Sequence, residues 1–300
     1  MNKSPSQPLW LTVAPLVSLL LWSGGYATAK VGLAYTGPMA LLVIRFGLVV
    51  AVMLLALLIF RPPLPKRAAD WGHLAVVGFL MQSVYFGFCY IAFSVGVGAG
   101  TLALLMSLQP IVVGIVAPAW THERVSAKRW VGLGMGLIGT AIVITAQSSI
   151  EPPTPTGMIC SAIALAGITA AALWEKRFGI SHHPVPANLI GYAVGLLGVL
   201  PFAFLLESAA GNWNIFAHTL WTWELTAAIA YLVIGNSVIA VGLLLAMIRA
   251  GEVSRVSALF FLVPPLAAII AWLLIGEVVT LFAWPGIILA AAGVFIATRN

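Results

Sequence analysis

Charge is the scarcest property of this chain. Only 7% of its 300 residues are charged, whereas a soluble domain carries about a quarter. The eight acidic residues all lie in expected loops or near the ends of apolar runs: Asp70, Glu123, Glu151, Glu175, Glu207, Glu224, Glu252 and Glu277. A carboxylate at the bilayer centre is costly and usually marks an ion relay. Coupling through a midplane carboxylate is therefore disfavoured, which leaves His73 and the span-end acids as alternatives.

The residues of metal, redox and nucleotide chemistry are also sparse. The two cysteines, Cys89 and Cys160, lie in apolar runs without the spacing of a metal site or a disulfide framework. The histidines fall in loops or at the ends of runs, again without ligand spacing: His73, His122, His182, His183 and His218. No phosphate-cradling glycine motif is present, so ATP-driven pumping by this chain alone is not expected. We expect no metal and no cofactor.

Long apolar runs dominate the chain instead, and 62% of its residues are hydrophobic. A helix of about 20 apolar residues spans the hydrocarbon core of a bilayer. Ten such runs are found: 9–29, 37–60, 71–93, 99–119, 128–147, 156–175, 187–206, 223–248, 254–275 and 281–298. They leave no room for a soluble domain. The sequence predicts an all-α integral membrane protein with ten transmembrane helices, the first being a retained anchor and not a cleaved signal peptide.

The basic residues give this membrane protein an orientation. They gather in alternate short loops: Lys3; Arg61, Lys66 and Arg67; Arg124, Lys128 and Arg129; Lys176 and Arg177; Arg249 and Arg255; and Arg299. Cytoplasmic loops are rich in lysine and arginine. The pattern predicts that both termini are cytoplasmic. It also accounts for the formal charge of +6 without a nucleic-acid partner.

Five residues recur later in the chain at a fixed offset of 154 positions. The matched sets are Pro110, Glu123, Trp130, Gly132 and Gly139, and Pro264, Glu277, Trp284, Gly286 and Gly293. Three basic residues lie between Glu123 and Trp130, but none lies between Glu277 and Trp284. Two copies of one unit that face opposite ways explain this difference. The alternative is coincidental similarity between apolar segments.

These residues resemble the EamA-type transporters of the drug/metabolite transporter superfamily, over nearly the whole chain. The resemblance rests on several short motifs: Leu21-Trp22-Ser23 followed by Lys30, Pro38 with Arg45, Leu108-Gln109-Pro110, Glu123 with Trp130-Val131-Gly132 and Gly139, Val263-Pro264, Gly276-Glu277, and Trp284-Pro285-Gly286 with Gly293. It implies two inverted five-helix repeats, residues 1–150 and 151–300, around a central cavity. It also implies export of small metabolites across the plasma membrane, the bacterial inner membrane. A YddG-type branch exports amino acids, but no motif places this chain in that branch.

Uncharged polar and aromatic residues at mid-depth are the candidates for lining the cavity. They are Trp22, Ser23, Tyr26, Gln82, Tyr85, Gln109 and Asn236. Each polar group would be costly against lipid, and a polar cavity is a natural place for such groups. The alternative for each is a hydrogen bond between helices, typically worth about 0.6 kcal/mol.

Lys30 and Arg45 are the basic residues that depart from the loop pattern. Arg45 lies about eight residues into its span, roughly 12 Å deep, and is not expected to face lipid. One interpretation is that these cations attract a substrate carboxylate. The alternatives are a structural arginine that bonds helix-end carbonyls, or side chains that extend outward to the interface.

Further residues suggest how the helices bend and pack. Pro110 and Pro264 lie mid-span, where proline removes a backbone hydrogen bond. They are either paired hinges or fixed bends. Glu123 and Glu277 are expected to cap the helices that follow them. Gly132 and Gly136 predict close contact between helices.

Three functions remain for such a chain. A secondary transporter would move a small polar metabolite, such as an amino acid, outward by alternating access at a midplane cavity. A channel would need a charged ring or a carbonyl filter, and a lipid-modifying membrane enzyme would need clustered acids, histidines or metal ligands. The sequence shows none of these, so it favours the transporter. The expected partners are a small-molecule substrate and the lipid bilayer, with monomer and homodimer both left open.

Overall fold

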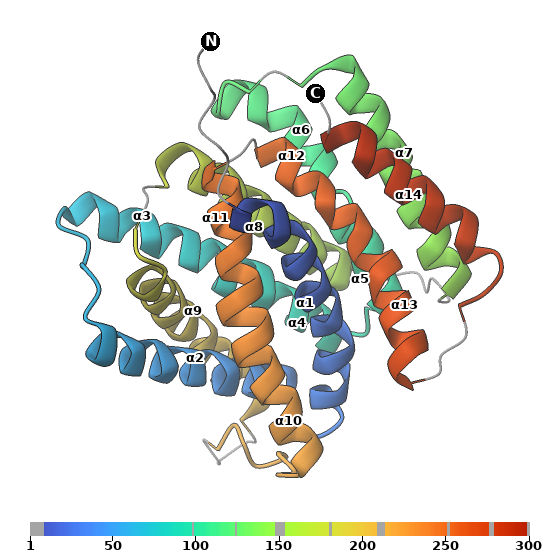
Figure 1. The fold of residues 1–300 in the computed structure, drawn as a ribbon. Coiled ribbons are helices and arrows are strands. Elements are labelled where there is room, and N and C mark those ends of the chain that lie inside the picture. The colour runs from blue at the N-terminus through green and yellow to red at the C-terminus, as the bar shows by residue number, and fades with distance from the viewer. Residues whose placement is uncertain are drawn as a thin grey trace.

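The computed structural model describes residues 9–97, 99–123, 125–147, 154–179, 182–208, 214–250, 253–275 and 279–298. The described chain is helical and contains no strand. The α-helices are α1 Leu9–Leu33, α2 Pro38–Phe60, α3 Ala68–Gly78, α4 Gly87–Ser94, α5 Ala99–Met106, α6 Gln109–Trp120, α7 Ala127–Gln147, α8 Pro155–Phe178, α9 Pro184–Glu207, α10 Trp223–Tyr231, α11 Val241–Ala250, α12 Val253–Ala258, α13 Val263–Ile275 and α14 Ala283–Thr298. Three tighter or wider helical segments join some of them: η1 Phe79–Phe86, η2 Leu232–Ala240 and η3 Leu259–Leu262. Figure 1 shows the arrangement.

Helix α2 illustrates how the sequence forms a span. Pro38 occupies its first position, where the missing N–H of proline costs nothing. The carboxylate of Glu207 accepts hydrogen bonds from the backbone N–H groups of Met39 and Ala40, at 2.5 and 2.8 Å. The helix ends where Arg61 adopts a left-handed conformation, with φ 43°. Its 23 residues give a length of about 35 Å, enough to cross a bilayer.

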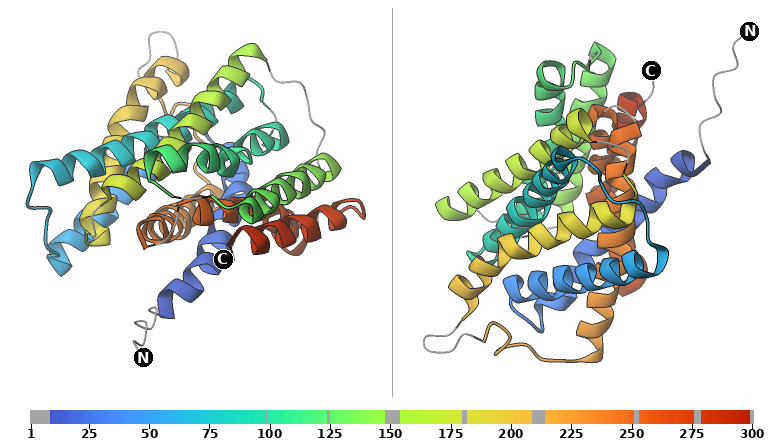
Figure 2. Two further views of the ribbon diagram at one scale, coloured as in Figure 1. Left: turned by 90° about the horizontal axis from the view of Figure 1, so that it is seen from above. Right: turned by 90° about the vertical axis from the view of Figure 1, so that its left-hand side faces the viewer.

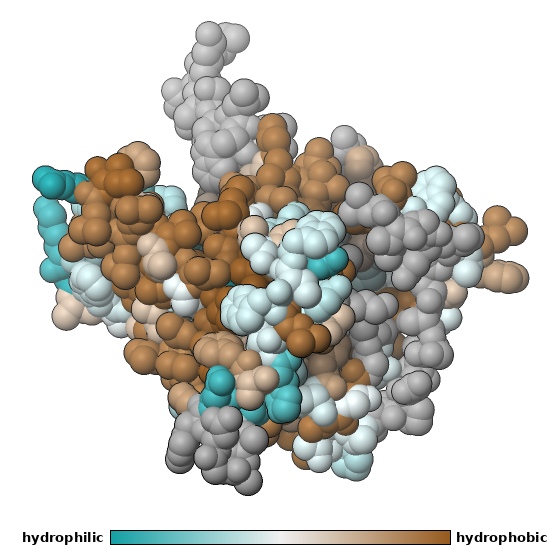
Figure 3. Space-filling model, turned by 90° about the horizontal axis from the view of Figure 1, so that it is seen from below, coloured by the Kyte–Doolittle hydropathy of each residue, from teal (hydrophilic) through white to brown (hydrophobic). Residues whose placement is uncertain are grey.

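Six helical runs in the described residues are long and apolar enough to cross a membrane: Pro38–Phe60, Ala68–Ser94, Ala127–Ala146, Pro155–Phe178, Pro184–Glu207 and Trp223–Ala250. Four shorter apolar helices lie at the other predicted spans: Val13–Gly25, Leu104–Trp120, Val256–Ala267 and Ala283–Thr298. Large apolar side chains, such as Leu55, Leu58 and Phe60 on α2, are exposed. Brown apolar surface dominates much of the face in Figure 3. The protein is therefore built as a membrane protein, and the count of ten crossings stays a prediction.

Helices α7 and α14 form a close contact and lie side by side in Figure 1 and in the left view of Figure 2. A Cβ added at Gly132 would lie 2.6 Å from the Gly293 carbonyl oxygen. A Cβ added at Gly139 would lie 2.6 Å from the Gly286 carbonyl oxygen. The later residue of α7 therefore contacts the earlier residue of α14, so the two helices are antiparallel. The glycine face predicted on α7 is confirmed as a helix contact.

The same glycines show that this contact is reciprocal. Gly286 and Gly293 stand 154 residues after Gly132 and Gly139. Gly132 meets the counterpart of Gly139, and Gly139 meets the counterpart of Gly132. Exchange of equivalent partners is the mark of a two-fold interface, here formed within one chain.

Two wide helical turns occupy matching places in the chain. Segments η1 and η2 have the π-helical pattern, inside α3–η1–α4 and α10–η2–α11 respectively. Adding 154 to the limits of η1 gives 233 and 240, within the limits of η2. Segment η1 packs on α8 and α9, and η2 packs on α1 and α2. Turns of this kind are rare and frequently lie at functional sites.

The two predicted spans that contain Pro110 and Pro264 are each interrupted shortly before the proline. Helix α5 ends at Met106 and α6 begins at Gln109, so Pro110 lies in the first turn of a new helix. On the other side, segment η3 separates α12 from α13, and Pro264 is the second residue of α13. Proline is well tolerated in a first turn. The sequence predicted one continuous helix over 99–119, and the structure shows a break instead.

Glu123 caps a helix, though not the one that follows it. Its carboxylate accepts hydrogen bonds from the N–H groups of Val253 and Ser254, at 2.7 and 3.3 Å, and from the Ser254 hydroxyl at 2.8 Å. These groups begin α12, whereas the expected partner was α7. Glu123 was correctly predicted to cap a helix, but the prediction that it caps α7 was wrong. The order of the chain does not reveal a partner 130 residues away. Glu277 lies outside the described residues.

Candidate substrate site

Arg45 is the central feature of the candidate site. Its side chain is 1% exposed, and it extends from the second turn of α2. The guanidinium donates from Nε to the Ser237 hydroxyl at 2.7 Å and from Nη2 to Asn236 Oδ1 at 2.6 Å. Both acceptors lie on the π-helical segment η2, whose widened turn presents neighbouring side chains to α2.

Aromatic rings complete the surroundings of the Arg45 guanidinium. Its carbon lies 4.6 Å from the ring centroid of Phe86 and 5.8 Å from that of Phe46. Attraction of a cation to a ring face strengthens when the pair is desolvated. No carboxylate in the described part of the chain pairs with Arg45. A buried positive charge with only neutral partners is costly, and an anion is the chemical partner that would offset this cost.

Residues from several elements meet around Arg45. Asn236 also donates from Nδ2 to the Leu21 carbonyl oxygen of α1 at 3.3 Å. The Tyr192 hydroxyl of α9 donates to the Ser237 carbonyl oxygen at 3.2 Å and interacts with Arg45 as well. The site therefore joins α1, α2 and η1 from the first half of the chain with α9 and η2 from the second.

Gln82 and Ser83 on η1 are the counterparts of Asn236 and Ser237, since 82 + 154 = 236 and 83 + 154 = 237. The Ser83 hydroxyl donates to the Gly195 carbonyl oxygen at 3.3 Å. Gly195 also leaves room for Gln82, because a Cβ there would overlap the Gln82 side chain. Gln82 is 3% exposed, and its Oε1 atom has no hydrogen-bond partner. The two halves thus bring an amide–serine pair each to the centre of the bundle.

A small cavity of about 20 Å³ with a mainly apolar lining lies beside Gln82, and it has room for about one water. Its polar lining consists of Gln82, Asn188, Tyr192, Glu175 and Arg249. Arg249 Nε and Glu175 Oε1 form an ion pair at 2.8 Å. Tyr192 lines this cavity, and its hydroxyl contacts both Gln82 and the Arg45 site.

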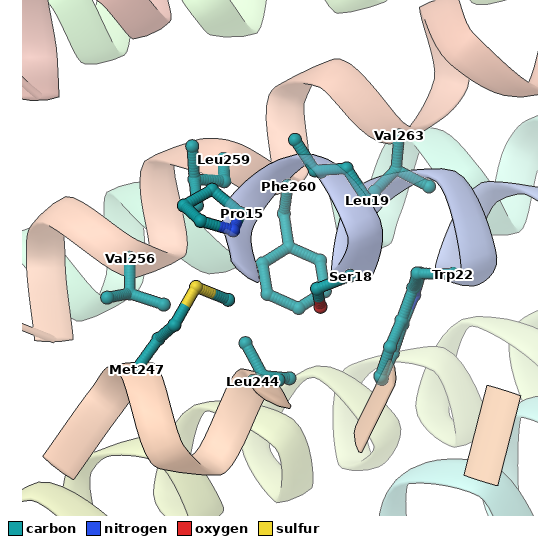
Figure 4. A pocket seen from close by; sticks show the side chains of 10 residues that line it. All are labelled: Pro15, Ser18, Leu19, Trp22, Leu244, Met247, Val256, Leu259, Phe260 and Val263. Carbon is teal, nitrogen blue, oxygen red and sulfur yellow. The ribbon is translucent and has the colours of Figure 1, made fainter. Parts of the chain in front are cut away.

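A second cavity, of about 10 Å³, is lined almost entirely by apolar groups. Figure 4 shows the side chains of α1, including Trp22, facing Leu244 and Met247 across it. The Trp22 ring meets Phe260 edge-on at 5.4 Å and lies 6.2 Å from Phe86. Phe86 thus contacts both Trp22 and Arg45. This cavity offers a polar metabolite little to bind.

The remaining candidates from the sequence lie in different surroundings. Gln109 donates to the Ser257 hydroxyl at 3.2 Å and joins α6 to α12, away from Arg45. Ser23 is fully buried, with no partner for its hydroxyl, and Tyr85 packs on Phe86 at 4.7 Å. The side chains of Tyr26 and Lys30 are outside the described set. The structure therefore brings Arg45 and Asn236 into direct contact and links Gln82 to them through Tyr192.

Several residues of the site were missed from the sequence, among them Tyr192, Ser237, Glu175 and Arg249. Ser237 could have been found, because Gln82-Ser83 and Asn236-Ser237 match at the offset of the repeat. Tyr192 and the ion pair carry no such signal. Their importance depends on contacts between helices that are distant in sequence.

Comparison with known proteins agrees with this architecture. The model of the EamA-like transporter family matches the chain twice, over residues 9–145 and 151–299. The chain belongs to the EamA-like transporter family. As a member of this family it is a multi-pass membrane transporter, and the bacterial inner membrane is the location typical of its relatives.

Relatives of this EamA-like chain are similar over nearly their whole length. A protein of Salmonella typhimurium named "Probable amino-acid metabolite efflux pump" is 26% identical over 94% of this chain and 92% of its own. A protein of Streptantibioticus cattleyicolor named "Probable terminal-alkyne amino-acid exporter" is 25% identical over 98% and 94%. A solved crystal structure that is 20% identical superposes with a TM-score of 0.78 over 96% of this chain and 97% of its own, and shows the same fold.

Proposed function

We propose that this protein is a secondary transporter that moves small carboxylate-bearing metabolites, such as amino acids, out of the cell. The observation that carries the proposal is the buried Arg45 guanidinium, whose partners in the described chain are neutral groups, among them Ser237 and Asn236, and include no carboxylate. Ionisable groups inside membrane bundles usually serve substrate or ion pathways. The names of two relatives, an amino-acid metabolite efflux pump and an amino-acid exporter, support the same substrate class.

The proposed architecture has two inverted halves, residues 1–150 and 151–300, with five spans each and both termini cytoplasmic. Three observations support it. Helices α7 and α14 exchange equivalent contacts in antiparallel orientation. The π-helical segments η1 and η2 stand at the repeat offset. Basic residues lie in only one copy of the matched loop. In transporters of this kind the substrate binds where the halves meet, and that is where Arg45 lies.

The closed packing around Arg45 supports alternating access as the proposed mechanism. The cavity beside Gln82 admits about one water, so a metabolite reaches Arg45 only when helices separate. The matched breaks before Pro110 and Pro264 are the proposed hinges. They divide one span of each half into two rigid pieces that can tilt independently. The substrate carboxylate would replace neutral groups as the partner of Arg45 and stabilise the occluded state.

Flux from liposomes tests this function. Vesicles that contain the purified protein and a labelled mixture of the twenty common amino acids are expected to lose at least one amino acid faster than equally loaded vesicles without protein do. Chemical identification of what leaves names the substrate, and runs with and without a proton gradient show whether protons are coupled. The proposal fails if the protein releases no carboxylate-bearing metabolite above the empty-vesicle rate, in this mixture or in a wider metabolite panel.

A further inference from the structure

The position matched to Arg45 in the other half of the chain holds an apolar residue. It is Val199 on α9, which stands 154 residues after Arg45. Both side chains are buried, with exposed fractions of 1% for Arg45 and 0% for Val199. The Arg45 guanidinium binds an amide oxygen and a hydroxyl on η2, those of Asn236 and Ser237. The repeat therefore provides two equivalent positions for a cation, and the protein fills one of them with its own side chain.

Gln82 and Ser83 on η1 form the matching amide–serine pair at the second position. Segment η1 packs on α9 as η2 packs on α2. A Cβ added at Gly87, the residue after η1, would lie 3.6 Å from the Val199 side chain, so Val199 faces this part of the chain. Gln82 is 3% exposed, and its Oε1 atom has no hydrogen-bond partner, whereas the matched oxygen on η2 accepts from the arginine. The second position thus keeps its acceptor but lacks its cation.

The unpaired oxygen of Gln82 belongs to a side chain that lies close to Arg45 and lines a cavity. The Tyr192 hydroxyl contacts both Gln82 and Arg45. Two contacts of hydrogen-bond length place the amide and the guanidinium within about 7 Å of each other. Glu175 and Arg249 line the same cavity but pair with each other, so they add no net charge to it. An unpaired buried acceptor is unfavourable, and an N–H group of a bound molecule would remove this cost.

The two positions together favour one class of molecule. A simple carboxylate would pair with Arg45 and leave Gln82 Oε1 unpaired, and a simple amine would do the reverse. An α-amino acid carries its ammonium and its carboxylate on one carbon. With one hydrogen bond of about 3 Å at each end, such a molecule can bridge the guanidinium and the amide oxygen. It is therefore the ligand that satisfies both groups.

We propose that Arg45 and Gln82 together recognise an α-amino acid, whose ammonium supplies the cation that is missing at the second position. The carboxylate binds the Arg45 guanidinium, and the ammonium donates to Gln82 Oε1. The same protein already holds a buried cation with a neutral amide oxygen, since Asn236 Oδ1 accepts from Arg45. The inference rests on the proposed transport function and assigns it a substrate class. Gln82 is the residue that selects amino acids over other carboxylates.

The competing interpretation is that one water fills the cavity beside Gln82 and donates to Oε1. The two accounts differ in ligand preference. A water satisfies Gln82 whichever carboxylate occupies Arg45, so it gives no preference for an amino group. A recognition site gives such a preference and loses it when the amide oxygen is removed. Preference between matched ligands is therefore the decisive measurement.

The experiment compares amino acids with acids that lack only the amino group. The pairs are L-alanine and propanoate, L-serine and 3-hydroxypropanoate, L-leucine and 4-methylpentanoate, and L-phenylalanine and 3-phenylpropanoate, together with any amino acid that the liposome assay identifies and its desamino acid. Binding to the purified full-length protein is measured by the ligand-dependent rise in melting temperature. The wild type is expected to bind at least one of the amino acids at least about tenfold more tightly than its desamino acid, because a charged donor then pairs with Gln82 Oε1.

Gln82→Met removes the amide oxygen and keeps an unbranched, flexible side chain. It is expected to reduce the preference to less than about threefold, because the amino acid loses its acceptor while the desamino acid loses nothing. Gln109→Met is the matched control. Gln109 is 2% exposed and its Oε1 atom also lacks a partner, but it joins α6 to α12 away from Arg45. The control is expected to keep the wild-type preference.

Three results would overturn the inference. The first is a wild type that binds the desamino acids as tightly as the amino acids, a ranking that decides the matter even if Gln82→Met does not fold. The second is a preference that survives in Gln82→Met or is lost equally in Gln109→Met. The third is a wild type that binds none of the amino acids. Flux of carboxylates without an amino group from the liposomes would still uphold the proposed function, whereas the absence of any carboxylate flux would refute it.

Discussion

Arg45→Gln is expected to reduce the flux of the carboxylate substrate by at least about tenfold. The substitution keeps a polar side chain next to Ser237 and Asn236 but removes the charge that we propose binds the substrate carboxylate. A hydrogen bond between charged partners contributes about 1.5–3 kcal/mol, or roughly 10- to 100-fold in an equilibrium constant. Initial rates of flux from liposomes that contain equal amounts of folded protein measure the effect.

A second buried arginine supplies the control for this prediction. Arg129 is also buried and donates to the Ser254 hydroxyl at 2.9 Å, next to the Glu123 cap and away from Arg45. Arg129→Gln removes a buried guanidinium without touching the proposed site. It is expected to lower the yield of folded protein more than the flux per folded molecule. Equal flux per folded molecule in Arg45→Gln and Arg129→Gln would contradict the role of Arg45.

Gly139→Val is expected to remove most of the folded protein. A Cβ at this position would lie 2.6 Å from the Gly286 carbonyl oxygen and still closer to the Ala290 backbone nitrogen. Backbone atoms cannot rotate aside as a flexible side chain does, so α7 and α14 would have to separate. Overpacking typically costs about 1–3 kcal/mol, and close approach of small residues is a main source of helix association in membranes. Size-exclusion profiles and melting temperatures of the purified variant measure the loss.

The same helix offers a matched position. A Cβ at Gly134 would meet nothing within 4 Å, although it lies only five residues before Gly139. Gly134→Val is therefore expected to leave yield and melting temperature close to those of the wild type. If both valine variants fold equally well, the antiparallel contact between α7 and α14 is not the one that holds the two halves together.

The sequence revealed the parts of the fold that follow from apolar length and from the spacing of the repeat. Apolar length predicted the membrane class, and the family comparison confirmed the transporter family. The repeated glycines predicted a close helix contact, which the α7–α14 pair confirms. These predictions succeeded because local composition and repeat spacing alone determine them.

Partners across the bundle could not be predicted in the same way. Arg45 was expected to avoid lipid, yet nothing near it in sequence indicates that Ser237, 192 residues away, accepts its hydrogen bond. Gln109 was predicted to line the cavity, but its side-chain amide instead donates a hydrogen bond to Ser257 on another helix. Burial predicts that a polar group needs a partner. It does not say whether that partner is a helix or a substrate.

Wide helical turns are a further feature that the sequence concealed. Segments η1 and η2 are as apolar as ordinary helices, and neither contains proline to mark an irregularity. Only the alignment of the two halves reveals that Gln82-Ser83 and Asn236-Ser237 occupy equivalent places. Segment η1 packs against α8 and α9, and η2 packs against α1 and α2, which are contacts that the local sequence does not reveal.

Inversion of the two halves is most directly tested by cysteines at matched, exposed positions. Ala127 and Leu281 stand 154 residues apart, and both are exposed. Each is replaced by cysteine in a chain whose two native cysteines, Cys89 and Cys160, are changed to alanine. With a membrane-impermeant maleimide, Leu281→Cys is expected to react in intact cells and Ala127→Cys only after the cells are opened. Labelling of both positions from the same side of the membrane would contradict the inverted arrangement and the substrate site built on it.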